Sequence, residues 1–174
     1  RRISQVTPSK STMPTHSRFH VPYLDLPRNR GRCLTGTLMT VRPAGADNFK
    51  LAVRQGASGA ERILIDPTAM KSDDGKHVSL DWWRASPDGK LVVYGLSPAG
   101  SENSVLHVME VASMRVLPER IAGTQYAQPS WLPDSSGFFY MRVADPSKIG
   151  KVDYYLNGPE LLHRLRTDPK DDPV

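Results

Sequence analysis

The stretch Ser86-Pro87-Asp88-Gly89-Lys90, followed by Leu91-Val92-Val93-Tyr94, decides the fold that this sequence predicts. Proline at the second position of a turn fixes the φ angle, aspartate accepts hydrogen bonds from the turn backbone, and glycine tolerates the tight corner. The residues after the turn are β-branched or aromatic and form a short run, which is typical of a β-strand. The sequence therefore predicts a tight turn that leads directly into a strand.

The same pattern returns further along the chain as Leu132-Pro133-Asp134-Ser135-Ser136-Gly137-Phe138-Phe139-Tyr140. The two copies align without a gap, since 133 − 87 and 140 − 94 both equal 46. Tryptophan precedes each copy, as Trp82-Trp83 and as Trp131. A unit of turn and strand that returns after about 40–50 residues is typical of the blades of a β-propeller.

A whole four-stranded blade can be assembled around the first turn. It contains an inner strand with Trp82-Trp83, then strands at 91–96, 104–111 and 115–121. We expect an all-β fold, an incomplete β-propeller of about two to two and a half four-stranded antiparallel blades with an irregular N-terminal segment. The blade remnants are expected at residues 48–67 (the outer half of a blade), 78–121 and 127–174, of which 127–166 would supply the inner three strands.

Residues 1–47 are expected to form an irregular basic leader, in which only 34–41 can form a strand. Residues 1–60 hold ten Lys and Arg against two Asp and Glu. The rest of the chain holds 23 − 10 = 13 Lys and Arg against 18 − 2 = 16 Asp and Glu, so the basic character belongs to the first third of the chain. The arginines at 28, 30 and 32 can contact phosphates, but a solvated segment is the simpler interpretation, and we expect no nucleic-acid partner. No apolar run approaches the ~18 residues of a membrane span, so no membrane partner is expected either. The start has no apolar signal region, so we expect no signal peptide in this stretch, and the missing Met indicates that the chain is a piece of something longer.

No pattern in the sequence predicts a cofactor, a metal site or a catalytic residue. His16 and His20 have helical spacing but lack the glutamate of a metalloprotease helix, and Asp73-Asp74-Gly75-Lys76 matches only part of a calcium loop. The closest approach to the nucleophile elbow G-x-S-x-G is Gly56-Ala57-Ser58-Gly59-Ala60, which lacks the last glycine and lies in a predicted hairpin turn. The lone Cys33 excludes an internal disulfide and is more simply a free thiol than a nucleophile.

Two histidines, His107 and His163, fall on the third strands of their predicted blades. The sequence indicates that they occupy matching places, which favours a structural or surface role. The tryptophans are expected to pack within the blades rather than to stack on a ligand.

Several further motifs lie at regular places along residues 49–174. They are Ile63-Leu64-Ile65-Asp66-Pro67, Ser72-Asp73-Asp74-Gly75, Ser86-Pro87-Asp88-Gly89-Lys90, Tyr94-Gly95-Leu96-Ser97, Gly100-Ser101, Trp131-Leu132-Pro133-Asp134, Gly137-Phe138-Phe139-Tyr140 and the tail His163-Arg164-Leu165 with Thr167-Asp168-Pro169-Lys170-Asp171-Asp172. In order and spacing these motifs resemble the prolyl oligopeptidase family. The tail resembles its "H-R-L-G-T-(x)-D-D" pattern, with Arg166 in place of the glycine, an awkward replacement if the position needs a positive φ angle.

This resemblance implies a serine peptidase, cytoplasmic or alternatively periplasmic, that hydrolyses short peptides after proline. In that family an N-terminal propeller covers an α/β-hydrolase domain, which carries the catalytic Ser, Asp and His and is reached only by small substrates. The implied partners are that hydrolase domain, normally in the same polypeptide, and short proline-containing peptides. We therefore expect this chain to be a fragment of the substrate-gating propeller, inactive by itself because the hydrolase domain is absent from it.

The resemblance also implies one substrate-binding residue, Tyr126. In the family, the loop before the turn at Trp131 faces the central chamber and gives an aromatic residue near the substrate. The match needs an insertion near Gly123, and a tyrosine that only shields the junction between blades is the alternative. A different function also stays open at this point: a non-enzymatic TolB- or WD40-like propeller, which also uses S-P-D-G-K turns, acting as a protein-binding scaffold.

Overall fold

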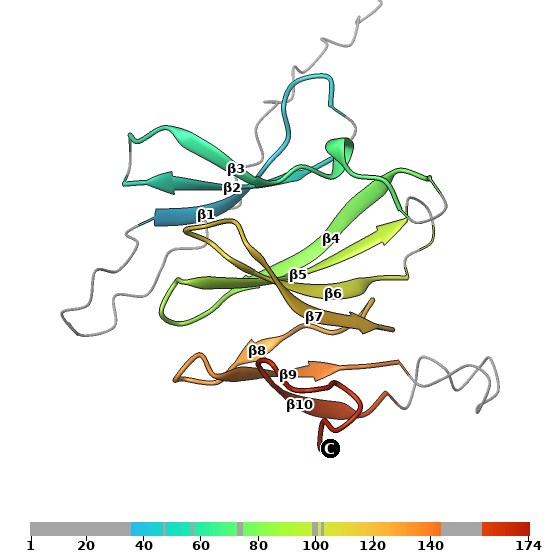
Figure 1. The fold of residues 1–174 in the computed structure, drawn as a ribbon. Helices are drawn as coiled ribbons and strands as arrows, with labels where there is room; N and C mark the ends of the chain where they lie inside the picture. The colour runs from blue at the N-terminus through green and yellow to red at the C-terminus, as the bar shows by residue number, and fades with distance from the viewer. Residues whose placement is uncertain are drawn as a thin grey trace, which may run out of the picture.

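The computed structural model describes residues 36–46, 48–56, 58–72, 75–98, 101, 103–143 and 158–174. These residues form ten β-strands and one short 3-10 helix, arranged in three antiparallel sheets that follow one another in chain order (Figure 1). The predicted all-β fold of an incomplete propeller is confirmed. Among the residues described, no helix has the length and apolar character needed to cross a bilayer.

The first sheet contains three described strands in the order β1-β2-β3. Its strand β1 is the stretch that the sequence identified as a possible strand inside the 1–47 segment, and it pairs antiparallel with β2 so that Leu38 lies opposite Val53. The sheet therefore begins before residue 48. The elements are β1 Gly36–Val41, β2 Lys50–Gln55, β3 Glu61–Ile65 and the 3-10 helix η1 Pro67–Ala69.

The middle sheet is the complete four-stranded blade that the sequence predicts, in the order β4-β5-β6-β7. Each strand pairs antiparallel with the next one along the chain, as tight turns require. The register of β4 on β5 shifts between Leu80 and Trp82, which places a β-bulge at Asp81. The strands are β4 Val78–Ala85, β5 Leu91–Pro98, β6 Val105–Glu110 and β7 Val116–Ala122.

The third sheet contains the predicted inner three strands of the next blade, in the order β10-β9-β8. They are β8 Ser130–Trp131, β9 Gly137–Met141 and β10 Glu160–Arg164. The 46-residue repeat is visible in the turns that precede β5 and β9. Gly89 (φ 69°) and Ser135 (φ 60°) are both left-handed. Asp88 and Asp134 each accept a bond from the backbone N–H two residues later, at 3.1 and 3.0 Å.

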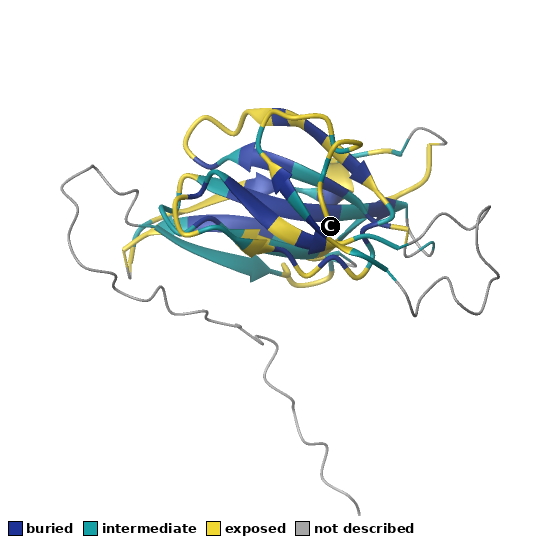
Figure 2. Ribbon diagram, turned by 90° about the horizontal axis from the view of Figure 1, so that it is seen from below, coloured by how far each residue is buried: buried dark blue, intermediate teal, exposed yellow. Residues whose placement is uncertain are grey.

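Two apolar clusters hold the three sheets together. Leu51 and Ile65 of the first sheet pack with Tyr94 of the middle sheet, and the opposite face of the middle sheet packs on Phe138 and Tyr140 of the third. Figure 2 shows that the buried residues follow the strands, while many of the exposed residues lie in the connections. Burial of apolar surface on both faces makes the middle sheet the centre of the described structure.

The tryptophans are expected from the sequence to pack within the blades, and in the structure two of their indole groups also form hydrogen bonds across the junctions between sheets. Trp83 Nε1–H donates to Thr40 Oγ1 of the first sheet at 2.9 Å. Trp131 Nε1–H of the third sheet donates to the backbone oxygen of Arg84 at 3.2 Å. Each ring is partly buried against an apolar cluster, and each indole N–H is satisfied at a sheet boundary.

The two third-strand histidines do not occupy matching places. His107 lies opposite Tyr94 and stacks on it, with ring centroids 5.5 Å apart. His163 lies opposite Phe138, not opposite Tyr140, the residue 46 positions after Tyr94. The predicted equivalence is therefore wrong by two residues, because the connection between β9 and β10 is longer than that between β5 and β6, and the sequence alone does not fix the register across it.

Candidate functional site

Tyr126, the site residue that the sequence predicts, lies in the turn between β7 and β8 and is half exposed. The buried residue Thr124 anchors this turn, since its backbone N–H and its hydroxyl both donate to the backbone oxygen of Ser104, at 3.1 and 2.9 Å. The N–H of Ala127 closes the turn on the oxygen of Thr124 at 3.1 Å. Tyr126 is thus carried by an anchored loop where the middle sheet passes into the third, and its contact with a substrate stays a prediction.

Trp82 of β4 fixes the same loop from the middle sheet. Its Nε1–H donates to the backbone oxygen of Thr124 at 3.1 Å. Its ring lies against Gly95, where an added Cβ would come within 2.4 Å of the indole. Only glycine leaves room for the ring, so the position of the loop depends on the absence of a side chain at residue 95.

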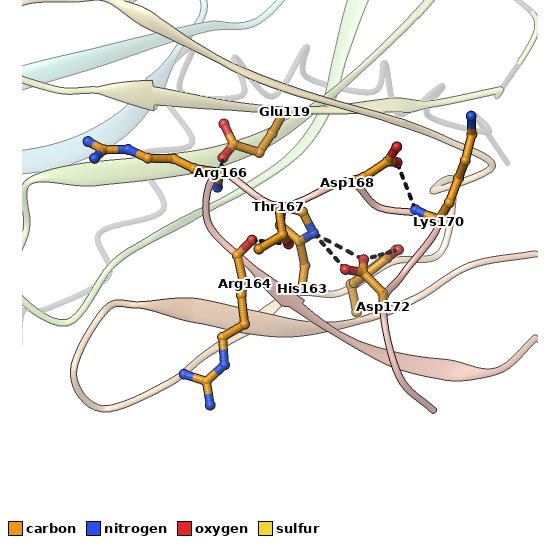
Figure 3. Close-up of polar contacts among 9 residues, drawn as sticks. Glu119, His163, Arg164, Arg166, Thr167, Asp168, Lys170 and Asp172 are labelled. Atoms are coloured by element: carbon orange, nitrogen blue, oxygen red, sulfur yellow. Dashed lines mark hydrogen bonds and ion pairs between the residues drawn. The ribbon is translucent and has the colours of Figure 1, made fainter.

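A second group of polar side chains lies where the third sheet meets the residues after β10 (Figure 3). His163 Nδ1 is 3.0 Å from both carboxylate oxygens of Asp172, and the Tyr140 hydroxyl donates to Asp172 Oδ2 at 2.9 Å. His163 is fully buried, and the side chain of Asp172 is 3% exposed. We call these three residues the Asp172 clip, because one buried carboxylate joins β9, β10 and the chain that follows.

The backbone strengthens the Asp172 clip. The N–H of Leu162 donates to the oxygen of Pro173 at 2.9 Å, so the chain after β10 returns along the edge of that strand. Burial raises the pKa of the Tyr140 hydroxyl, and its hydrogen bond to Asp172 raises it further. The hydroxyl therefore stays protonated, and a hydrogen-bond donor, at neutral pH.

The His163–Asp172 pair has the geometry of a histidine oriented by a carboxylate, but not the surroundings of a catalytic pair. In a catalytic triad, the second ring nitrogen of the histidine forms a hydrogen bond with the nucleophile that attacks the substrate. His163 Nε2 is buried and forms no hydrogen bond with any residue that the structure describes. The pair is therefore a structural element of the third sheet; the sequence favoured a structural or surface role for His163.

Arg166 follows β10 in the left-handed conformation, with φ 68°. This is the position at which the family pattern has glycine, and the positive φ angle explains that preference. The backbone N–H of Arg166 donates to Glu119 Oε1 at 2.6 Å, and Glu119 is buried on β7. The tight turn thus ties the outer strand of the middle sheet to the third sheet.

The other residues considered for chemistry fall into two groups. Ser58 lies exposed in the turn between β2 and β3, beside Gly56 at φ 64°, so the structure supports the turn interpretation. The residues His16, His20, Cys33, Asp73 and Asp74 and the arginines at 28, 30 and 32 lie outside the described residues. Within the described ranges, no three His, Cys, Asp or Glu side chains are placed to hold a metal ion.

The family model for the prolyl oligopeptidase N-terminal β-propeller domain matches residues 41–174. The chain is 30% identical over 143 residues to Prolyl oligopeptidase A of Galerina marginata and 30% identical over 112 residues to Prolyl endopeptidase of Elizabethkingia miricola. These alignments cover 70% and 64% of this chain but only 18% and 15% of the relatives.

Solved structures give the same result. The chain superposes with a TM-score of 0.73 on a structure from a study of two prolyl endopeptidases, at 35% identity, covering 83% of this chain and 21% of that one. Prolyl oligopeptidase B of Galerina marginata, bound to a 35mer substrate, superposes with a TM-score of 0.66 at 19% identity, covering 80% and 22%, which supports the fold alone. The chain thus spans at most about a fifth of the length of these relatives.

Proposed function

The chain belongs to the family of prolyl oligopeptidase N-terminal β-propeller domains, and from this premise we propose that it is part of the substrate-gating propeller of a serine peptidase that hydrolyses short peptides after proline. The family match over residues 41–174 is the observation that carries the proposal. The proposal places the catalytic Ser, Asp and His in an α/β-hydrolase domain of the same polypeptide. That domain and short proline-containing peptides are the proposed partners.

The packing of the sheets suits a gate that selects by size. Apolar clusters fill both junctions of the middle sheet, and indole hydrogen bonds link each sheet to the next. Close-packed sheets of this kind move as rigid bodies, because their side chains interdigitate. We infer that such a wall excludes folded proteins and admits only short, flexible peptides.

We propose further that Tyr126 contacts the peptide. It is a half-exposed aromatic residue on a loop that Thr124 and Trp82 hold in place. An aromatic ring offers a large apolar face to proline or another apolar residue at little cost in side-chain entropy. In the complete peptidase, Tyr126→Ala is expected to raise KM several-fold with little change in kcat, and Tyr126→Phe should restore most of the loss.

The direct test is the hydrolysis of a proline-containing peptide. We expect no turnover from the 174-residue chain, and turnover that a serine-directed inhibitor abolishes from a longer product of the same gene that includes a hydrolase domain. Inhibitor-sensitive turnover by the chain alone would contradict the proposal. So would a longer coding sequence with no nucleophile elbow.

A cytoplasmic location, with the periplasm as the alternative, is part of the same proposal. It rests on the family resemblance only. Cell fractionation with an antibody against the chain checks it, with the peptidase activity expected in the cytoplasmic fraction.

A further inference from the structure

Asp81 presents an exposed carboxylate at the β-bulge of β4. The register passes from Leu80 opposite Leu96 to Trp82 opposite Gly95, so Asp81 is the extra residue of the bulge. A bulge re-aims the side chain of its extra residue and is frequent beside functional sites. The bulge, and not the regular pairing of β4 with β5, therefore sets the direction of the Asp81 side chain.

Two buried serines hold this carboxylate. Ser97 Oγ donates to Asp81 Oδ1 at 2.9 Å, and Ser104 Oγ donates to Asp81 Oδ2. Both serines are almost completely buried, whereas Asp81 is exposed. An ionised carboxylate accepts about four hydrogen bonds, so acceptor capacity remains on its solvent side. Among the residues that the structure describes, no lysine, arginine or histidine forms an ion pair with Asp81.

The carboxylate is connected to the loop of Tyr126. The hydroxyl of Ser104 bonds Asp81, and the backbone oxygen of Ser104 bonds Thr124. Trp82, the residue after Asp81, donates to the oxygen of Thr124. Asp81 and Tyr126 thus lie on the two segments that meet at Ser104 and Thr124, and both are exposed at that end of the middle sheet.

We propose that Asp81 and Tyr126 form a binding site for a cationic group of a peptide, either its N-terminal ammonium or the ammonium of a lysine side chain. A fixed carboxylate gives charge-assisted hydrogen bonds to such a group. The ring of Tyr126, on the loop that Thr124 ties to Ser104, offers its face to the same cation. The site rests on the proposed function in one respect, since it takes a peptide as the ligand.

The test is an NMR titration of the ¹⁵N-labelled 174-residue chain with three probes. The probes are the peptide amide Phe-Gly-Pro-Ala with a free N-terminus, its N-acetylated form, and N-acetyl-Lys-Gly-Pro-Ala amide. We expect the amide signals of Asp81, Ser104 and Tyr126 to shift, and at least one of the two cationic probes to bind about three- to tenfold more tightly than the neutral one. Comparison of the two cationic probes identifies which ammonium the site takes. The preference should fall at about 0.5 M salt.

Variants locate the effect on the named side chains. Asp81→Asn should remove the preference for cationic probes, while Glu160→Gln, the same change at another exposed acidic residue, should keep it. Tyr126→Leu should weaken cationic binding about two- to threefold and Tyr126→Phe should not. Tyr126→Leu changes a half-exposed side chain, so it keeps the test valid if Asp81→Asn fails to fold.

Three results would overturn this site. Equal affinity for the neutral and cationic probes would do so, as would a preference that survives Asp81→Asn, and so would the absence of binding to the folded chain at about 10 mM peptide. None of these results bears on the peptidase proposal, which the hydrolysis test decides separately.

Discussion

The middle and third sheets have equivalent turns before their second strands and the same strand register. They differ in what covers the outer edge of the third strand. In the middle sheet, β6 turns back into the outer strand β7, which covers its edge with a ladder of backbone hydrogen bonds. In the third sheet, the chain after β10 returns with one described backbone bond, from Leu162 to Pro173, and with the buried carboxylate of Asp172. The same edge is thus covered once by a strand and once by the Asp172 clip.

This difference shows where each sheet is vulnerable. A ladder spreads its stabilisation over many backbone groups, so the loss of one side chain leaves it in place. The clip concentrates its stabilisation in one carboxylate that serves a histidine and a tyrosine. Substitutions at equivalent places in the two sheets should therefore have unequal effects.

The largest difference is expected between neighbouring aspartates. Asp172→Ala removes the buried acceptor of His163 and Tyr140 and should lower the free energy of unfolding by about 3–5 kcal/mol. Asp171→Ala, at an exposed neighbour, should change it by less than about 0.5 kcal/mol. Urea denaturation with hydrogen exchange of the β9 and β10 amides measures both. Equal effects would show that the clip does not hold the third sheet.

Gly137 and Leu91 occupy equivalent places, 46 residues apart, and should respond differently to alanine. A Cβ at Gly137 would lie 2.2 Å from the backbone oxygen of His163, so Gly137→Ala must displace β10 and should cost about 2–3 kcal/mol. Leu91 already carries a half-buried side chain, and Leu91→Ala should cost about 1 kcal/mol. Thermal unfolding of the two variants decides this, and a smaller loss for Gly137→Ala would refute the close approach of β9 and β10.

Substitutions at two residues with positive φ angles should change the free energy of unfolding in opposite directions in the two sheets. Gly89→Ala forces a β-carbon into φ 69° and should destabilise the middle sheet by about 1 kcal/mol. Arg166→Gly relieves the same strain after β10, and should raise the free energy of unfolding by up to about 1 kcal/mol, because the bond from its backbone N–H to Glu119 is kept. Chemical denaturation checks both signs. A lower free energy of unfolding for Arg166→Gly would mean that contacts of the Arg166 side chain stabilise the fold by more than the positive φ angle strains it.

The smallest effect concerns pH and the stacked pair of the middle sheet. Burial, together with the charge of Arg120, lowers the pKa of His107 below its usual range, so the unfolded chain binds more protons than the folded one at mildly acidic pH. The contribution of His107 is therefore complete above about pH 6.5 and is lost as the pH falls through the lowered pKa. His107→Phe should flatten this part of the curve of unfolding free energy against pH. An unchanged slope would assign the pH dependence to other groups.

Most of the fold could be predicted because its signals are local. The turn at Asp88 and its repeat at Asp134 depend on residues within each turn, and the short apolar strands follow directly. The glycine of the family pattern also indicated a positive φ angle at Arg166. The strand order follows from hairpins, which need no long-range information.

The rest depends on contacts that no local pattern records. The Asp172 clip joins residues 32 positions apart, Tyr140 and Asp172, and nothing in the sequence indicates that His163 would be buried against them. The bulge at Asp81 arises from a register shift between two strands, which the alternation of β4 does not predict. For the same reason the match between His107 and His163 was wrong, while Tyr126 could be placed in its loop but not against a substrate.

The central claim is that the middle and third sheets are successive blades with the same register. The N–H of Val111 bonds the oxygen of Lys90, and the N–H of Leu165 bonds the oxygen of Ser136, so Val93–Val108 and Phe139–Leu162 are both non-hydrogen-bonded pairs. The Hα atoms of such pairs lie close together, and NOESY spectra of the 174-residue chain should show strong Hα–Hα cross-peaks for both. A cross-peak for Val93–Val108, with Phe139 contacting Leu161 or His163 in place of Leu162, would contradict the claim.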